Sequence, residues 1–314
     1  MPPDPVGHDA RSRARPPGVA LVAAATVLAL ISAVALTLAH TTVVDQRLTR
    51  NALMAMQADA LARSGVAVAT VALAATSAGG APDTLASPWA VDVGRQPLGA
   101  GWLEVHVEDA ARRLDLNAAE LADALPRLLA TLGLDPGLAD AIADWTDPDD
   151  VARPHGAERS WYAARTPALV PRNGPIASVD ELALIRDLTP AVLDRLRPYV
   201  TVAGEHTVNP NTASREVLLA VIADPAAVAR LLDARQRRAL DDDDVAALVG
   251  DESPGLLATH GQRYEVHALA AVGEIRRGVD ATVWAPSGAD PSVVAWRPFV
   301  PRASAGEHRV HLPM

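Results

Sequence analysis

The chain has 314 residues, a formal net charge of −10 and an isoelectric point of about 5.3. This acidity argues against a nucleic-acid partner, because phosphate binding requires concentrated positive charge. Cysteine and lysine are both absent, which excludes disulfides, thiolate metal sites, lysine-dependent phosphate loops and Schiff-base catalysis.

The first predicted element is an apolar run of 21 residues, Val19 to Ala39, which follows Gly18 and a leader with three arginines. As a helix the run extends about 31 Å, which is enough to cross the hydrocarbon core of a bilayer. The arginines favour a cytoplasmic leader, so we expect the rest of the chain outside the cytoplasm.

This run does not end as a secretory signal peptide does, because the apolar core of such a peptide is usually about 7–15 residues long. The chain continues without proline to Ala75, and small or apolar residues recur at spacings of four and three, as on one face of an amphipathic helix. We therefore expect one helix over residues 19–76, with a membrane-spanning first half and a second half that packs on its own domain. The expected face consists of Met54, Ala58, Leu61, Gly65, Val68 and Ala72.

Beyond this helix, glycine and proline predict loops over residues 77–97, and alternating segments predict strands that form a small antiparallel sheet. Residues 110–200 and 214–249 have helical patterns, with Asn117 and Ser178 as N-caps and a capping box between Ser178 and Glu181. The expected strands are Trp102–Val107, Arg263–Val272, Val279–Ala285 and Val293–Phe299, and the expected helices before residue 200 are Ala118–Leu132, Pro136–Trp145, Val179–Ile185 and Pro190–Val200.

Two short segments echo each other, Leu-Asn-Ala-Ala at residues 116–119 and Pro-Asn-Thr-Ala at residues 210–213. Each reads as an asparagine cap before an apolar helix, and chance in an alanine-rich chain is the alternative. Farther on, residues 241–244 are four aspartates before another apolar helix. They indicate an N-cap and a first turn whose carboxylates the helix dipole favours.

The segment from Asp144 to Asp150 is the sharpest chemical cluster. Its carboxylates lie at the end of a predicted helix and in a proline-containing loop, from which they could converge on a hard cation such as calcium. Glu158 could close such a site from the far side of the loop. Because the spacing is not that of an EF-hand, a solvated acidic loop with side-chain turns is the alternative interpretation.

Residues 172–193 have the order of a helix-hairpin-helix element, and such elements often bind the DNA backbone through the amides of a glycine-containing hairpin. Here the hairpin reads Asp187-Leu188-Thr189-Pro190, with no glycine and one amide missing. The order of the element makes a membrane-anchored DNA-capture protein of a competence-like system the alternative function. The departures in the hairpin and the acidic charge of the chain disfavour it. An exported hydrolase has less support, because the sequence has no metalloprotease or serine-hydrolase signature, and we expect no enzyme.

Several motifs in one order resemble the minor pseudopilin K family of type II secretion (general secretion pathway protein K). The resemblance runs from about Gly18 to Thr212 and is most specific in the middle. The motifs are Leu114–Asn117, Asp144-Trp145 with residues 147–150, Gly156–Glu158, Pro171–Pro175, Ser178–Leu182 and Val208–Thr212.

The resemblance implies an α+β fold with a long transmembrane and amphipathic helix, a small pilin-like antiparallel sheet and a large inserted, all-helical, helix-hairpin-helix-like domain. The implied boundaries are a prepilin leader at 1–18, the N-terminal helix at 19–76, a pilin-like domain at 77–108 and 201–314, and the inserted domain at 109–200. Prepilin peptidase would cut after Gly18, and the new amine of Val19 would be methylated.

The same resemblance implies a subunit at the tip of the periplasmic pseudopilus, with one span of the inner membrane and the globular part in the periplasm. Its partners would be the minor pseudopilins I, J and H and the major pseudopilin. It also implies bound calcium, which we carry over to Asp144, Asp147, Asp149 and Glu158. Major pilin-like subunits have a glutamate at the fifth mature position, which is thought to pair with the N-terminal amine of the neighbouring subunit. This chain has Ala23 there, as expected for a tip subunit with no further subunit above it.

Overall fold

The computed structural model describes residues 17–77, 79–92, 94–250 and 255–301, so residues 1–16 of the expected leader lie outside the described residues. The chain divides into two compact units, Met1–Met56 and Gln57–Met314. Helix α1 spans Pro17–Ser77, which confirms the long helix expected from the sequence.

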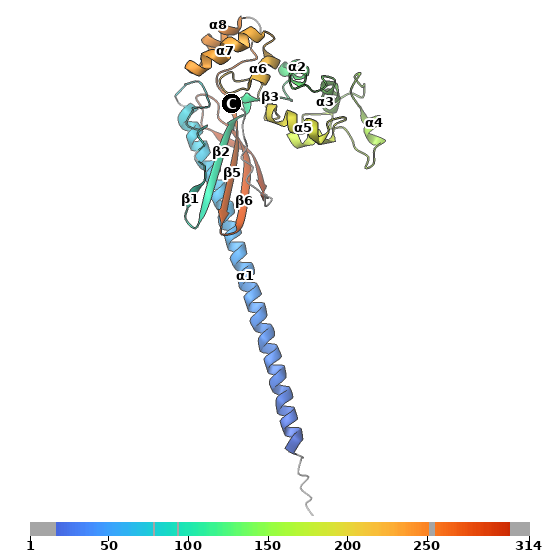
Figure 1. The fold of residues 1–314 in the computed structure, drawn as a ribbon, viewed down its shortest axis with the longest axis vertical. Coiled ribbons are helices and arrows are strands. Elements are labelled where there is room, and N and C mark those ends of the chain that lie inside the picture. The colour runs from blue at the N-terminus through green and yellow to red at the C-terminus, as the bar shows by residue number, and fades with distance from the viewer. Residues whose placement is uncertain (1–16, 78, 93, 251–254, 302–314) are drawn as a thin grey trace, which may run out of the picture. The chain divides into compact units, whose positions relative to one another are not determined.

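The described part of the first unit is the N-terminal part of α1 (Figure 1), which contains the apolar run Val19 to Ala39. Its large side chains are turned outward, with Leu21, Leu28 and Leu36 exposed by 74%, 66% and 73%. Among the described residues, this helix alone is long and apolar enough to cross a membrane, by its length and composition. Exposure of such side chains suits a helix whose solvent is lipid.

The sheet of the second unit has five antiparallel strands in the order β1-β2-β5-β6-β7 (Figure 1). Burial alternates along β2 and β5, because successive side chains of a strand point to opposite faces. The strands are β1 (Gln96–Leu98), β2 (Gly101–Asp109), β5 (Arg263–Val272), β6 (Ile275–Trp284) and β7 (Ser292–Phe299).

The second half of α1 packs on this sheet through small residues, and its closest approach is at Gly65. A Cβ atom there would lie 2.8 Å from Cγ2 of Val105 and 3.1 Å from Cβ of Ala268, so only glycine allows this spacing. The expected face of the helix is wrong in part, since Val68 is 63% exposed. An alanine-rich helix presents apolar side chains on several sides, and contact with the sheet selects one. The buried residues are Ala58, Ala62, Val66, Ala69 and Leu73.

The neighbouring strands β2 and β5 are separated in sequence by a large helical unit that has its own buried core. This core extends from Leu114 to Val249, whereas the core between α1 and the sheet draws on residues 62–107 and 264–285. By this core, residues 201–249 belong to the inserted helical unit, which was expected to end at residue 200. The unit contains β3 (Leu114–Asp115), α2 (Ala124–Thr131), α3 (Leu138–Thr146), α4 (Arg159–Ala163), α5 (Pro190–Leu196), β4 (Val200–Thr201), α6 (Arg215–Val221), α7 (Pro225–Arg237) and α8 (Asp242–Val249), with 3-10 turns at 110–112, 119–121, 179–184 and 197–199.

Two of the expected helix caps are wrong. Asn117 caps no helix, and the Ser178 side chain makes no capping bond to the 3-10 turn that follows it. The Glu181 carboxylate accepts instead from Nε1 of Trp145, at 2.9 Å, and from the backbone N–H of Ala177. The expectation for the aspartates at 241–244 is confirmed, because Asp241 and Asp244 form the capping box of α8.

The echoed segments share one structural device. The side-chain amide of Asn117 donates to the carbonyl of Ile176 and accepts from its N–H, at 3.0 and 2.8 Å. Asn211 does the same with Leu240, at 2.9 and 3.0 Å. Each asparagine side chain thus forms a pair of hydrogen bonds with the backbone of one distant residue. The two segments are therefore alike in structure, although their interpretation as two helix caps is wrong.

Buried polar side chains connect the helical unit to the end of the sheet. The Asp109 carboxylate, at the end of β2, accepts from Nδ2 of Asn209 and Oγ1 of Thr212, both at 2.8 Å. The Asp83 carboxylate accepts from the hydroxyl of Tyr264 on β5 at 2.6 Å, and its backbone carbonyl accepts from Asn209. Burial, together with the nearby charge of Asp83, raises the pKa of Asp109 to about 6.

Glu205 joins the same region from the helical side. Its Oε1 accepts from the N–H of Gln262, at 2.8 Å, and from the N–H of Arg263 at the start of β5. Burial, together with the charge of Asp109, raises the pKa of Glu205 to about 7. The folded chain therefore retains a proton here after the unfolded chain has released it.

The substitution Glu205→Gln should remove this pH dependence while keeping the accepting Oε1. A raised pKa makes the glutamate's contribution largest below the unfolded pKa of 4.5, and this contribution is lost as the pH rises through about 7. The stability of the original chain relative to the variant should therefore fall by about 3 kcal/mol from pH 4.5 to 7. Denaturant unfolding at several pH values measures this difference. Glu274→Gln, at an exposed position, is the control and should give a flat difference.

Candidate metal centre

Helix α3 and the loop after it bring three of the four predicted ligands together. Asp144 and Asp147 lie three residues apart, at the end of α3 and just after it, which places them on one side of the helix. Glu158 precedes α4, and one ligand atom from each of these carboxylates lies within 4.8 Å of the others. Asp149 lies outside this group, and its Oδ1 accepts from the N–H of Val151 at 2.8 Å.

The group contains buried oxygen atoms that have no hydrogen-bond partner among the described residues. They are both carboxylate oxygens of Glu158 and Oδ1 of Asp147. Glu158 is 4% exposed and Asp144 is fully buried. Burial, reinforced by the neighbouring carboxylates of Asp144 and Asp147, raises the pKa of Glu158. Unpaired buried acceptors are costly, so a cation in the described site would remove a specific destabilisation.

Asn173 is a residue whose part in this region the sequence did not predict. Its N–H donates to the carbonyl of Trp145 at 3.0 Å, and its Nδ2 donates to the carbonyl of Asp149 at 3.4 Å. Its own Oδ1 is buried without a partner among the described residues. The available signal in the sequence was the Asn-Gly pair of the Arg-Asn-Gly-Pro segment, which indicates a turn. Asn173 has a φ angle of 48°, which asparagine tolerates better than most residues.

The loop from Asp147 to Glu158 closes tightly over Asp144. The Arg153 N–H donates to Oδ2 of Asp144 at 3.0 Å, and its Nη1 donates to Oδ1 of the same carboxylate at 2.6 Å. The same Nη1 also donates to Asp147. A Cβ atom at Gly156 would overlap Oδ2 of Asp144, so the backbone approaches the carboxylate where only glycine fits.

The donor set fits a hard cation. Calcium takes about 6–8 oxygen ligands from carboxylates, amide or backbone carbonyls and water, and it tolerates irregular geometry. Three carboxylates within reach of one point, two of them with unpaired oxygens, match this chemistry. The group contains no histidine or sulfur ligand of the kind that softer metals prefer.

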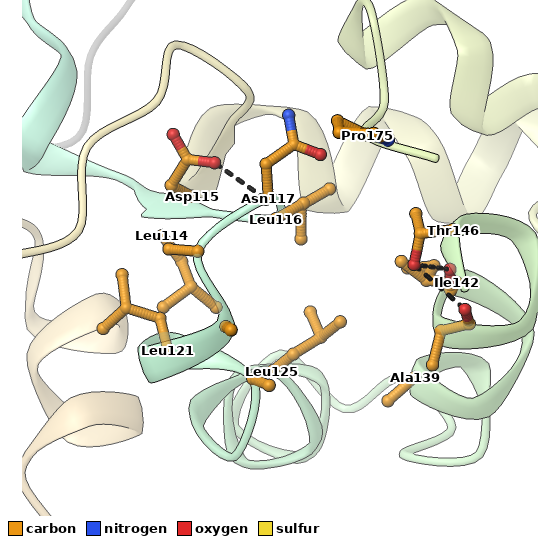
Figure 2. A pocket seen from close by; sticks show the side chains of 14 residues that line it. Leu114, Asp115, Leu116, Asn117, Leu121, Leu125, Ala139, Ile142, Thr146 and Pro175 are labelled. Carbon is orange, nitrogen blue, oxygen red and sulfur yellow. Dashed lines mark hydrogen bonds between the residues drawn. The ribbon is translucent and has the colours of Figure 1, made fainter. Parts of the chain in front are cut away.

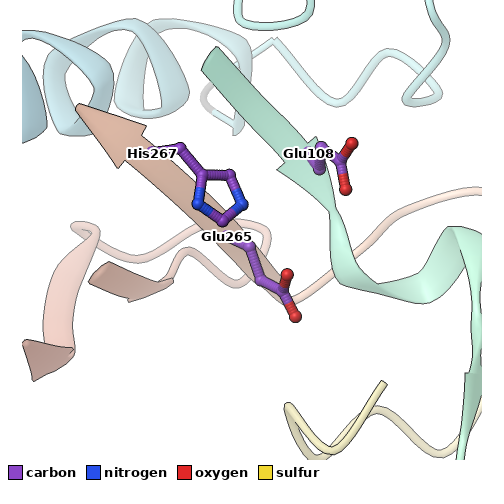
Figure 3. A group of neighbouring side chains, drawn as sticks. All are labelled: Glu108, Glu265 and His267. Carbon is purple, nitrogen blue, oxygen red and sulfur yellow. The ribbon is translucent and has the colours of Figure 1, made fainter. Parts of the chain in front are cut away.

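A second cluster of titratable groups lies on β2 and β5, where Figure 3 shows Glu108, Glu265 and His267. Its carboxylates are already paired, because Arg113 donates to both of them and Glu265 also accepts from Oγ1 of Thr201 at 2.9 Å. Despite burial, the hydrogen bond from His106 and the charge of Arg113 lower the pKa of Glu108 to about 2. This cluster is therefore an ion-paired link between the sheet and the loop before β3.

A mostly apolar pocket of about 310 Å³ lies between the segment at β3 and helices α2 and α3 (Figure 2). Leu116, Leu125 and Ile142 are among its walls, and Asp115 is the titratable residue that lines it. The Asp115 carboxylate accepts from three backbone N–H groups, those of Asn117, Gly204 and Glu205. It therefore fixes the backbone of this segment.

Two amides of the hairpin in the helix-hairpin-helix-like element are bonded to carbonyls of the same segment. The Leu188 N–H donates to the carbonyl of Ile185 and the Thr189 N–H to that of Asp187, at 3.3 and 3.0 Å. Pro190 has no N–H, and the Thr189 side chain caps α5 through the N–H of Val192. Because these two amides are already bonded, they are not free to contact a phosphate.

Comparison with protein families identifies residues 107–205 as a match to "Type II secretion system (T2SS), protein K". The chain is 33% identical over 172 residues to type II secretion system protein K of Klebsiella pneumoniae, a match that covers 48% of this chain and 52% of that protein. It is 31% identical over 162 residues to the Aeromonas hydrophila protein of the same name, covering 46% and 48%. The chain thus spans about half the length of the curated relatives that it matches.

The fold is similar to that of a chain in the crystal structure of the GspK-GspI-GspJ complex from enterotoxigenic Escherichia coli. The TM-score is 0.69 with 21% sequence identity, and the match covers 80% of this chain and 99% of that chain. At this identity the likeness shows the fold. It confirms the α+β architecture expected from the sequence.

Gly156→Ala should destabilise the chain by about 2 kcal/mol or more, because the added methyl overlaps the buried Asp144 carboxylate. Thermal melting of the full-length chain in detergent, with a chelator present, measures the loss. Gly174→Ala is the matched control, because the nearest atom to its added Cβ, the carbonyl oxygen of Arg172, lies 3.9 Å away. Equal melting temperatures for the two variants would contradict the close approach at Gly156.

Proposed function

We propose that this chain belongs to the type II secretion system protein K family and is a minor pseudopilin at the tip of the type II secretion pseudopilus. The match of residues 107–205 to that family supports this proposal. In this role the chain supports pseudopilus assembly and protein export across the outer membrane, and it is a structural subunit with no catalysis. The observation that carries the proposal is the family match within a fold that joins a long apolar helix to a pilin-like sheet.

The proposed partners are the minor pseudopilins I and J, then pseudopilin H and the major pseudopilin. The support is the similarity of the fold to that of a chain in the crystal structure of a GspK-GspI-GspJ complex. The large inserted helical unit also suits the tip, because the insertion between β2 and β5 adds bulk that a repeated shaft subunit would have to accommodate at every level.

Co-expression with pseudopilins I and J tests this function. We expect the full-length chain in detergent to co-elute with both as one complex through affinity and size-exclusion steps. Pseudopilins I and J of an unrelated secretion system are the control and should not be retained. Elution of the chain apart from its own I and J would contradict the proposal. Retention of duplex DNA on filters at low salt would instead favour the DNA-capture alternative.

We propose that the apolar part of α1 anchors the chain in the inner membrane, with the globular part in the periplasm. Prepilin peptidase would cut between Gly18 and Val19, and the new amine of Val19 would be methylated. The support is a helix long and apolar enough to span, directly after an arginine-containing leader. In the absence of a fifth-position carboxylate, Ala23 avoids the cost of a charge in lipid.

Intact-mass and N-terminal peptide analysis of the chain, co-expressed with prepilin peptidase, tests the processing. We expect a mature chain that begins at a methylated Val19. Expression without the peptidase is the control and should leave residues 1–18 attached. A cut near Ala39, or an unprocessed chain in the presence of the peptidase, would contradict pilin-type processing.

We propose that Asp144, Asp147 and Glu158 bind calcium. Asp149 is close enough in sequence to become a further ligand after the loop adjusts. The support is the convergence of three carboxylates and the buried oxygens that lack partners among the described residues. Bound calcium would supply positive charge to these oxygens and hold the α3–α4 loop in place. The residues do no chemistry on it.

Calcium should raise the melting temperature of the full-length chain, because a ligand of the folded state alone stabilises it by about 4 kcal/mol at a thousandfold excess over Kd. Melting with EGTA and with millimolar calcium measures the shift. Glu158→Gln removes one ligand charge and should reduce it, whereas Glu274→Gln, at an exposed position, should retain it. An unchanged melting temperature of the original chain in calcium would remove the metal assignment.

A further inference from the structure

We infer that Arg153 sets the calcium affinity of this site, as a tethered cation that pairs with the metal-free carboxylates and leaves when calcium binds. The inference rests on the calcium site proposed above. It assigns to one residue of this chain a role that the ligand set alone does not contain: competition with the metal for the same oxygens.

The first support is the position of the guanidinium group. One nitrogen, Nη1, donates to both Asp144 and Asp147, at 2.6 Å from Oδ1 of the former. Calcium binds carboxylate oxygens at about 2.3–2.6 Å. The nitrogen therefore occupies the space that a metal bound to the same two oxygens would need, and the two cations exclude each other.

The second support is that Arg153 neutralises the group only in part. It donates to Asp144 and Asp147, while both oxygens of the buried Glu158 are without a partner among the described residues. A single guanidinium charge thus contacts two carboxylates of a group of three. A divalent ion that contacts all three would compensate more charge than the arginine does.

The third support is that Arg153 can leave without unfolding the loop. Its side chain is 41% exposed, so the guanidinium group has a path to solvent. The backbone N–H of the same residue donates to Oδ2 of Asp144 at 3.0 Å, a bond that does not involve the side chain. The Gly156 carbonyl accepts from Arg186 at 2.8 Å and holds the loop independently.

Two opposite effects of removing this cation follow. Without calcium, Asp144 and Asp147 lose the partner that they share, so the chain should be less stable. With calcium, the metal no longer has to displace a charged group, so binding should be tighter. A residue that merely stabilised the loop would lower stability and weaken calcium binding together, which distinguishes the two roles.

The test is calorimetric titration of calcium chloride into the full-length chain in detergent, for the original sequence and for Arg153→Gln. We expect the calcium Kd of Arg153→Gln to fall about tenfold or more, since bonds between charged groups are replaced. The same variant should melt at a lower temperature in EGTA and gain more from calcium than the original chain does.

Arg159→Gln is the matched control. It removes the same charge near the same loop, but Arg159 pairs at 3.5 Å with the exposed Asp150 and not with the three carboxylates. Its calcium Kd should stay within about twofold of the original, as expected for an exposed pair. Arg153→Lys, which retains the charge, should tighten binding less than Arg153→Gln and serves if the glutamine variant does not melt cooperatively.

The outcomes separate the two proposals. Calcium binding by the original chain with an equal or higher Kd in Arg153→Gln would overturn the role of Arg153 and leave the calcium site standing. Binding by Arg153→Gln alone would support the competition in its strongest form. Absence of binding by both chains would overturn the calcium site and, with it, this inference.

Discussion

Two buried aspartates, Asp83 and Asp109, lie where the sheet meets the helical unit. The hydrogen bonds that these aspartates accept attach the helical unit to the sheet. Asn209 connects both, through the Asp109 carboxylate and the Asp83 carbonyl, and Tyr264 connects Asp83 to β5. Each of these groups is buried, so an unmade bond here is expensive, at about 1–3 kcal/mol for a neutral group and more for a charge. The network fixes where a large insertion leaves and re-enters the sheet between two paired strands.

The second unit contains two separate cores, one between α1 and the sheet and one inside the helical unit. The sheet and the end of α1 form an apolar core in which Gly65 permits close packing. The helical unit has its own core and contains the carboxylate loop between α3 and α4. A metal bound in that loop would order a local segment of the proposed tip, and Arg153 would keep the same segment closed when calcium is scarce. The packing of α1 on the sheet does not depend on whether this loop holds a metal.

Local patterns were sufficient for much of the fold. Alternation identified β5 with its observed bounds, and the proline-free apolar run identified α1. Spacing also brought Asp144, Asp147 and Glu158 into one predicted site. What the sequence could not show were side chains whose partners are distant: Asn117 bonds to a residue 59 positions away, and Asp83 to one 181 positions away. A local rule interprets such residues as caps or turns, because nothing nearby identifies the remote partner.

Buried polar bonds make the end of the sheet and the helical unit one structural body. Hydrogen–deuterium exchange of the full-length chain and its Asn209→Ala variant tests this claim most directly. In Asn209→Ala we expect faster exchange both in helices α6–α8 and at the end of the sheet where β2 pairs with β5. Asn117→Ala removes bonds inside the helical unit and should affect that unit alone. Faster exchange confined to the helices in Asn209→Ala, with an unchanged sheet, would contradict the claim.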